Sequence, residues 1–515
     1  MQLIRTIVTV GGYTFLYRIS CVLRDTAQAA VLGAGPIADA FVVAFKLANV
    51  LRKLFAEGSF NAAFLPRFSA ILNKQGRSAA EQLASQVFSW LLIVLVLLLA
   101  LCFFSFPAII RGYAPGFLPG SDRFLYAVEL GRLCFPYIAT SFLVALFGSI
   151  MNTLNRFALP AASQLLLNVF LIVAMSLGAC SFATIAHTMA IATFFAGLAQ
   201  MFLLWADLSY RAGFSVRGTT HLRSTEALQV FKKILPGAVG AGIWQLNLMI
   251  GVAIASSLKT GAVSCFYYAD HVNQFPLGVL GIGLGTALLP LLSKAIQKGD
   301  WTRAQYQLNL GVLLAVIMTL PVTIFFLAIP EDITSLFYEH GKFGHEQVCA
   351  TAPALAAFAI GLPAYMLAKV FSTALFAQSN TRHPCFAGFL SVVTCIGTIP
   401  LFVPRFQQAG IALAISCAAW VNALALYAFL RHARVLSVFP QTWKACVALS
   451  IAGGVMWVVL DGGQWLFASY CLCACHGFFY LCLLGGCGGL SFWLIGRWFG
   501  AFSSMYALMH KAEKE

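Results

Sequence analysis

Long apolar stretches alternate with short polar loops along the whole chain. A helix needs about 20 apolar residues to cross the hydrocarbon core of a bilayer, and this length predicts fourteen spans. Their approximate limits are 5–31, 37–65, 83–109, 125–151, 158–179, 184–206, 228–256, 263–292, 306–329, 350–378, 385–404, 409–430, 445–460 and 477–499. We therefore expect an all-α integral membrane protein with about 14 transmembrane helices.

The composition excludes a soluble or secreted protein. Of the 515 residues, 60% are hydrophobic and 10% are charged, and the mean hydropathy is +0.86, which lies outside the range of soluble globular domains. The 15 cysteines lie singly in apolar runs, as small buried residues do, and form no disulfide framework. Arg18 interrupts the first apolar stretch and no A-x-A cleavage site follows it, so we expect that stretch to remain as the first span.

The basic residues indicate the orientation in the membrane. Lys and Arg number 32 against 17 Asp and Glu, a net charge of +15, and most of them fall in alternate loops. The opposite loops hold Arg111, Arg123, Lys259, Lys342 and Arg405, and the loop around 331–346 is acidic. The positive-inside rule then places both termini in the cytoplasm. Nucleic-acid binding is not needed to explain the basic balance.

The two halves of the chain resemble each other. Residues 63–69 (AFLPRFS) match 287–293 (ALLPLLS), and Pro160 recurs as Pro384 at the same distance. Repeats of six spans share one orientation, as in transporters that bind substrate between two halves. We predict an N-lobe of spans 1–6, a C-lobe of spans 7–12, and a C-terminal helix pair with a short cytoplasmic tail. Their limits are 1–223, 224–435 and 436–515.

Ionisable residues are concentrated in the first two spans. Each costs at least about 2.5–3.5 kcal/mol on insertion scales, so such a residue normally faces a water-filled cavity and marks a function. The candidates are Arg18, Arg24 and Asp25 in the first span, and Asp39, Lys46, Arg52, Lys53 and Glu57 in the second, with Asn49 beside this stripe. The second half contributes Asp270 and His271, with Ser264 upstream.

The surplus of cations predicts an anionic substrate. Arginine binds phosphate oxygens through two parallel hydrogen bonds and keeps its proton where water is scarce. A structural alternative is internal pairing, for instance Arg24 with Asp25 or Lys53 with Glu57, which would only lower the cost of insertion. Such pairing accounts for the acidic residues of these spans but not for the larger number of basic residues.

Motifs of enzymes are absent. The chain has no H-E-x-x-H, G-x-S-x-G or P-loop sequence. Cys471, Cys473, Cys475 and His476 have poor spacing for a tetrahedral metal site. We therefore expect no catalytic residues, no metal and no cofactor.

The second span carries the clearest resemblance to a known family. Residues 24–25 (RD), 33–35 (GAG), 38–41 (ADAF), 44–47 (AFKL), 49–52 (NVLR) and 55–58 (FAEG) resemble the MurJ (MviN) family of lipid II flippases. Further matches occur at 152–157 (NTLNRF), 267–270 (YYAD), 275–281 (FPLGVLG) and 341–343 (GKF). The resemblance covers spans one to twelve.

The resemblance implies a fold and a function. The fold is that of the MOP exporter superfamily, with two six-helix lobes and a terminal helix pair. The function is movement of lipid II, an undecaprenyl-pyrophosphate disaccharide pentapeptide, to the outer leaflet of the bacterial inner membrane by alternating access through a cationic cavity. Lipid II, membrane lipids and peptidoglycan synthases are the expected partners, and the membrane potential or a monovalent cation is the expected energy source.

The resemblance and the charged positions together define the expected site. Substrate binding is expected of Arg18, Arg24, Asn49, Arg52 and Ser264. Roles in the cavity wall or in gating are expected of Asp25, Asp39, Lys46, Lys53, Glu57, Asp270 and His271.

Two positions depart from the family pattern. His271 stands where the family has Arg, and Gln274 stands where it has Glu. One positive and one negative group are lost together, which suggests that they interact in relatives. Either His271 is dispensable, or it is a protonatable substitute for the arginine.

Two other functions fit a membrane protein of this kind. One is export of another polyprenyl-linked glycan or of a drug. The motifs of the second span argue against a drug more strongly than against a glycan. The other is an intramembrane glycosyltransferase acting on the same lipid. Such an enzyme would need a carboxylate base or a metal beside a large outer loop, and the outer loops here are short.

Overall fold

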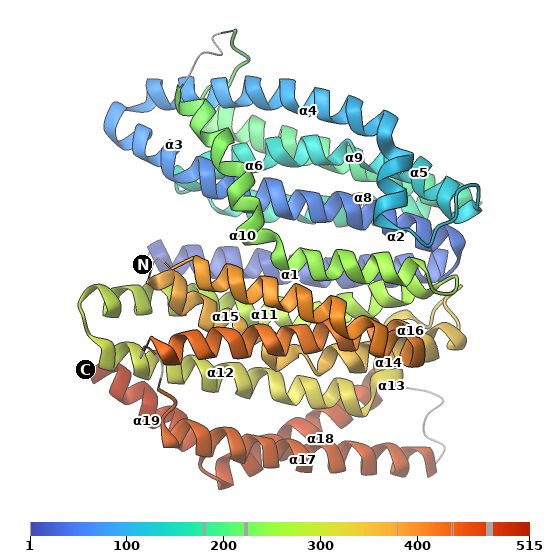
Figure 1. Ribbon diagram of the computed structural model, residues 1–515, viewed down its shortest axis with the longest axis vertical. Coiled ribbons are helices and arrows are strands. Elements are labelled where there is room, and N and C mark those ends of the chain that lie inside the picture. The colour runs from blue at the N-terminus through green and yellow to red at the C-terminus, as the bar shows by residue number, and fades with distance from the viewer. Residues whose placement is uncertain are drawn as a thin grey trace. The chain divides into compact units, whose positions relative to one another are not determined.

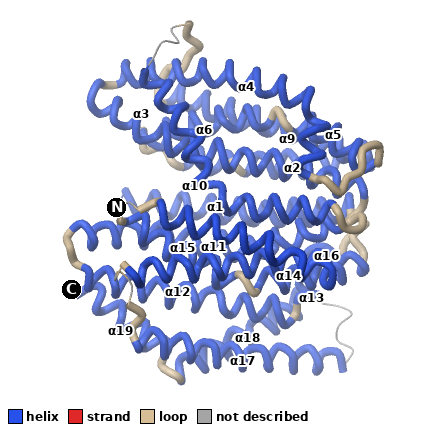
Figure 2. The backbone as a smooth tube through the Cα atoms, viewed as in Figure 1, coloured by secondary structure: helices blue, strands red, loops and turns tan. Residues whose placement is uncertain are grey.

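The computed structural model consists of helices joined by short loops. It describes residues 2–178, 182–220, 225–378, 380–433, 435, 437–469 and 477–514. None of these residues lies in a strand (Figure 2). The expected all-α fold is confirmed.

The chain forms two compact units. The first unit comprises Met1–Ser264 together with the short segment His340–Phe343, and the second comprises Cys265–Glu339 and Gly344–Glu515. The helices of the first unit are α1 (Gln2–Leu32), α2 (Pro36–Leu51), the π-helix η1 (Arg52–Phe60), α3 (Asn61–Gln75), α4 (Arg77–Tyr113), α5 (Asp122–Cys134), α6 (Tyr137–Thr153), α7 (Ala158–Ser163), α8 (Leu165–Leu177), α9 (Phe182–Ala206), η2 (Asp207–Arg211) and α10 (Thr225–Ser256).

The second unit begins within the first turn of α11 (Ala262–Gln297). Its remaining helices are α12 (Trp301–Ala328), α13 (Pro330–Tyr338), α14 (His345–Ala359), α15 (Leu362–Ala377), α16 (Arg382–His432), α17 (Pro440–Ser469), α18 (Gly477–Trp498) and α19 (Ala501–Lys514). Figure 1 shows α17 and α18 side by side, and both pack against α12.

Each predicted span overlaps a helical segment, and two of the predicted spans lie within α16. Among the described residues, nine helices are long and apolar enough to cross a membrane. Helix α1 is not among these nine, and neither are α2 and α3, which have 16 and 15 residues. The number of crossings therefore stays a prediction, whereas a multi-span membrane protein is well supported.

A sharp bend divides α16 between the predicted spans 385–404 and 409–430. Gln407 has φ 50° and ψ −127°, outside the helical region, and Pro400 and Pro404 precede it. Proline removes a backbone donor and breaks the helical ladder. The bend therefore falls where the sequence pattern places the loop.

The surface of α4 shows how the helices meet lipid. Val96 is 63% exposed, Leu97 66% and Phe104 79%. A water-soluble protein would rarely leave such a continuous apolar face open. In a bilayer the same face lies against acyl chains at no cost.

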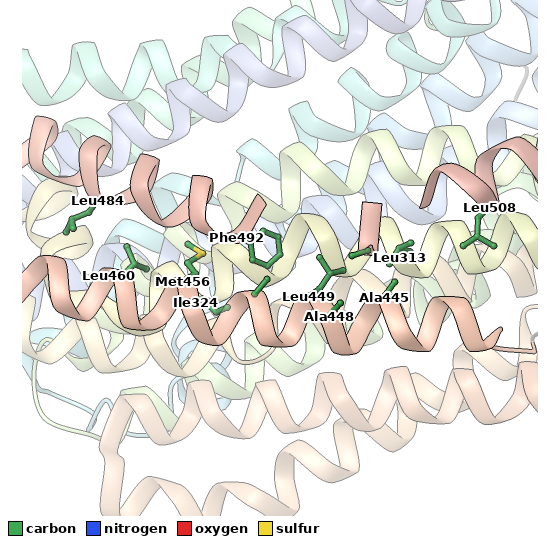
Figure 3. Close-up of a cluster of buried hydrophobic side chains, with 12 residues drawn as sticks. Leu313, Ile324, Ala445, Ala448, Leu449, Met456, Leu460, Leu484, Phe492 and Leu508 are labelled. Carbon is green, nitrogen blue, oxygen red and sulfur yellow. The ribbon is translucent and has the colours of Figure 1, made fainter. Parts of the chain in front are cut away.

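The terminal helices pack into an apolar core of the second unit. Figure 3 shows Leu449 and Met456 of α17 facing Phe492 of α18 and Ile324 of α12. Small residues permit this close approach: a Cβ added at Gly488 would lie 3.0 Å from the Leu460 side chain. Small residues at contacts are typical of helix packing in membranes.

The compact units do not follow the predicted lobe limits. Helix α10, which the repeat assigns to the C-lobe, packs on η1 and α3 in the first unit. The terminal pair packs with α12 in the second unit. The compact units are defined by packing, whereas the predicted lobes are defined by the internal repeat. The division into an N-lobe, a C-lobe and a terminal helix pair therefore stays a prediction.

Candidate functional site

A buried carboxylate joins the start of α2 to the start of α11. Asp39 lies in the first turn of α2 and its side chain is fully buried. It accepts hydrogen bonds from the backbone N–H of Gly261 at 2.7 Å, the backbone N–H of Ser264 at 2.9 Å and the Ser264 hydroxyl at 2.7 Å. The first N–H groups of a helix lack partners within it and carry partial positive charge. Asp39 satisfies them, so the predicted residues Asp39 and Ser264 do lie together.

Three turns meet beside this carboxylate, and we call residues 33–35, 257–261 and 340–343 the turn cluster. Gly33 has φ +65°, and a Cβ there would lie 2.8 Å from the Lys342 carbonyl oxygen. Gly261 has φ +92°, and a Cβ there would lie 2.8 Å from the Ala34 carbonyl oxygen. The Lys342 N–H donates to the Ala30 carbonyl at 2.8 Å. Only glycine combines the left-handed backbone with such close approach.

A cationic side chain, that of Arg123, lies near Asp39. The nearest guanidinium nitrogen of Arg123 is 4.0 Å from the carboxylate, and the same guanidinium lies over the Phe117 ring at 5.0 Å. The sequence pattern assigned Arg123 to an outer loop and gave it no role in the site.

Arg24 and Asp25 form a buried ion pair in α1. Their side chains are 3% and 2% exposed, and Nε and Nη2 of Arg24 donate to one oxygen of Asp25 at 3.0 and 2.5 Å. Nη1 donates to the amide oxygen of Asn168 in α8 at 3.0 Å. The guanidinium also lies 5.4 Å from the centre of the Phe45 ring. Arg24 and Asp25 therefore pair with each other, as the alternative of internal pairing predicted.

Arg18 lies on the same helix, half-buried. Its Nε is buried and has no hydrogen-bond partner among the described residues. The guanidinium of Arg18 is thus less fully engaged by the protein than that of Arg24.

The burial of the charged side chains of the second span changes at η1. Lys46 and Arg52 are buried, at 6% and 5% exposure, whereas Lys53 is exposed. Nε of Arg52 donates to the Asn49 side chain at 3.4 Å. A continuous helix is expected over the second span, and the chain is π-helical within it from Arg52 to Phe60.

The side chain of Glu57 lies outside the described residues, so its predicted pairing with Lys53 is untested. Residues 471–476, which hold the weak cysteine and histidine metal candidate, also lie outside them.

A polar cavity of about 290 Å³ lies within the first unit, next to Arg52. Its wall combines one guanidinium with side-chain amides, hydroxyls and a few apolar groups. The lining residues are Arg52, Asn61, Ser141, Val144, Ala145, Gly148, Ser149, Asn152, Pro160, Gln164, Gln200 and Leu204.

In the second unit, Asp270 and His271 lie on adjacent positions of α11. Asp270 is 3% exposed and accepts a hydrogen bond from the Gln274 amide at 2.9 Å, one turn away. The His271 ring lies 4.1 Å from the ring of Tyr267. Gln274, one of the two departures from the family pattern, therefore contacts the acidic residue of the site.

Sequence reasoning missed Asn168 and Gln200. Each is a polar residue in the middle of a predicted apolar span, and each is almost fully buried. That combination is a usable signal, because a buried amide in a membrane helix needs a polar neighbour. Neither residue carries a charge, so the pattern of ionisable positions does not include them.

Comparison with known proteins identifies the family. The profile of a family described as "Lipid II flippase MurJ" matches residues 28–475. The chain belongs to this family. It is 34% identical over 469 residues to a protein of Rhizobium meliloti named "Probable lipid II flippase MurJ", covering 90% of this chain and 87% of that protein. It is 33% identical over 475 residues to "Lipid II flippase MurJ" of Burkholderia cenocepacia, covering 90% and 91%.

Solved structures support the fold of the MurJ family and its superfamily. The structure titled "Lipid II flippase MurJ, inward closed conformation" matches with a TM-score of 0.80 and 22% identity, over 96% of this chain and 99% of that chain. An inward-facing multidrug resistance MATE transporter of the MOP superfamily matches with a TM-score of 0.69 and 14% identity, over 82% and 98%. The fold expected of this chain is therefore confirmed.

Proposed function

We propose that this chain is a flippase that moves lipid II from the inner to the outer leaflet by alternating access. The observation that carries the proposal is membership of the lipid II flippase family over residues 28–475. The relatives are named flippases, and the catalytic motifs sought in the sequence are absent. The chain therefore acts as a transporter and not as an enzyme.

The charges of the first unit fit such a substrate. A pyrophosphate needs cationic donors that stay protonated away from bulk water, and arginine meets this requirement. Arg18 and Arg52 are the better candidates for direct contact. Arg24 holds Asp25 and Asn168 in this structure, so it binds substrate only after a rearrangement. Export of a different polyprenyl-linked glycan and glycosyl transfer receive no support from the relatives.

An accessibility assay tests the proposal. Cells depleted of the chain should accumulate lipid II that an externally added, membrane-impermeant hydrolase cannot reach. Re-expression of the wild-type chain should restore its access to lipid II. Lipid II that remains fully accessible after depletion would refute the proposal.

Location and orientation belong to the same proposal. The chain lies in the bacterial inner membrane with both termini in the cytoplasm, a proposal that the distribution of basic loops supports. Phosphatase fused after residue 340 should be active outside the cytoplasm, and phosphatase fused after residue 300 should not. The reverse pattern would contradict the orientation. Peptidoglycan synthases, which consume lipid II, are the proposed protein partners.

The energy source is the membrane potential or a monovalent cation. Moving an anionic head group out of an inside-negative cell is favourable by roughly 2.3 kcal/mol per charge per 100 mV. The outward step therefore needs no nucleotide, in keeping with the missing P-loop.

A further inference from the structure

A cysteine, a histidine and a glutamate form a chain of contacts at the start of α14, in the second unit. Nε2 of His345 lies 3.5 Å from Sγ of Cys349, and Nδ1 of His345 lies 3.3 Å from Oε1 of Glu339. The Ser335 hydroxyl donates to the other oxygen of Glu339. We call Glu339, His345 and Cys349 the thiol cluster. The proposed transport of lipid II uses none of these residues.

Two packed helices hold the thiol cluster in place. His345 and Cys349 are four residues apart at the start of α14, and this spacing puts them on one face of the helix. Glu339 follows α13 directly, and its N–H donates to the Ser335 carbonyl of that helix at 2.9 Å. Helices α13 and α14 pack against each other. The contacts of His345 therefore follow from regular structure on both sides.

The thiol cluster lies open at the surface. Cys349 is exposed, whereas Cys265 and Cys395 are buried, and His345 is 73% exposed. Cys349 also precedes the predicted span 350–378. In the proposed orientation this part of the chain lies outside the cytoplasm, where disulfides persist. A dissolved molecule can therefore reach this thiol.

The contact with Glu339 determines which ring nitrogen of His345 can take up a proton. A carboxylate oxygen only accepts hydrogen bonds, so this contact favours the ring form with hydrogen on Nδ1. Nε2 is then the acceptor, and it lies beside the Cys349 sulfur. A nucleophile next to a base that a third group orients is the arrangement that activates the nucleophile.

We propose that Cys349 is a site of thiol–disulfide exchange with a low-molecular-weight disulfide, with His345 as the proton acceptor and Glu339 as the residue that orients it. The thiol proton passes to Nε2 of His345 while Sγ of Cys349 attacks one sulfur of the disulfide. A new S–S bond forms as the old one breaks, and the departing thiolate takes the proton from His345. The disulfide is the only oxidant. The products are a mixed disulfide on Cys349 and one free thiol.

The rate of modification by hydroxyethyl disulfide tests the proposal. This probe is neutral, so its approach does not depend on the local charge. The full-length chain is purified into nanodiscs, and mass spectrometry of the peptide that carries Cys349 distinguishes this thiol from the other cysteines. His345→Gln keeps a polar side chain that cannot take up the proton, and it should slow the modification at least about tenfold. Removal of the label by a reductant identifies the product as a disulfide.

A pair of matched variants separates orientation from charge. Glu339→Ala and Glu346→Ala each remove one carboxylate, and Glu346 is exposed next to His345 with no hydrogen bond or ion pair recorded within the described part of the chain. Loss of a negative charge beside a thiol favours the thiolate, so charge alone predicts faster modification in both variants. The proposal predicts modification that is several-fold slower in Glu339→Ala and not slower in Glu346→Ala.

The outcomes decide the proposal in either direction. An unchanged or faster rate in His345→Gln or in Glu339→Ala would overturn it, as would equal slowing by Glu346→Ala. A Cys349 that the probe leaves unmodified in the wild type would overturn it as well. His345→Asn is the second variant should His345→Gln lower the thermal unfolding midpoint. Each of these results leaves the flippase proposal standing, because the readout is modification of a thiol and not transport.

Discussion

The bond between Ser264 and Asp39 should be worth a measurable part of the stability of the first unit. Ser264→Ala removes one of the three hydrogen bonds to the buried carboxylate. A hydrogen bond to a charged group contributes about 1.5–3 kcal/mol, so we expect a loss of that size in the free energy of unfolding.

Asp39→Ala should cost more than Ser264→Ala. It removes all three bonds and leaves the N–H groups of Gly261 and Ser264 buried without this acceptor. Each unsatisfied group adds about 1–3 kcal/mol. We therefore expect a loss at least about twice that of the serine variant.

A double-mutant cycle isolates the contact. Denaturant unfolding of the purified chain in mixed micelles gives the free energy for wild type, both single variants and the double variant. Ser264→Ala should cost almost nothing in the Asp39→Ala background, because its partner is gone. Ser163→Ala is the control: its buried hydroxyl donates to Pro160 in its own helix at 2.8 Å, so its smaller cost should not depend on Asp39. An equal cost of Ser264→Ala in both backgrounds would refute this reasoning.

Three further results are expected. Arg24→Ala and Arg52→Ala should each abolish flipping. Arg24→Ala also leaves the buried Asp25 carboxylate without its counter-charge. If adding Asp25→Asn restores transport, Arg24 serves structure and does not bind substrate. His271→Ala should complement a depleted strain and Asp270→Ala should not, since Asp270 is buried and hydrogen-bonded. An inactive His271→Ala together with an active, pH-insensitive His271→Arg would instead show that His271 is a protonatable substitute for the family's arginine. Collapse of the membrane potential with ATP present should halt flipping in vesicles, and unchanged flipping under a verified collapse would exclude electrical coupling.

The apolar pattern predicted the helical segments well, because span length is imposed by the bilayer. The charged positions and the family resemblance also placed Asp39 and Ser264 in one site, although the reason differs from the one expected. The carboxylate binds the N-terminus of α11, a contact between residues more than two hundred positions apart. No local periodicity contains that information.

The π-helix was beyond prediction from the pattern. Its hydrogen bonds run from i to i+5, and only the stretch Arg52–Phe60 adopts it in the second span. Arg52 could be recognised as a buried cation, but the cavity beside it requires Gln200 and Ser149 from two other helices.

The Arg24, Asp25 and Asn168 arrangement has a consequence for biogenesis. Arg24 and Asp25 are neighbours in sequence, whereas Asn168 follows 144 residues later. At about 5–20 residues per second, the ribosome needs roughly 7–30 s to reach Asn168 after Arg24. During that interval the nascent first helix must reside in or beside the translocon without its amide partner. Asp25 is already present to neutralise Arg24, so the order of synthesis supplies the counter-charge first and the interhelical bond last.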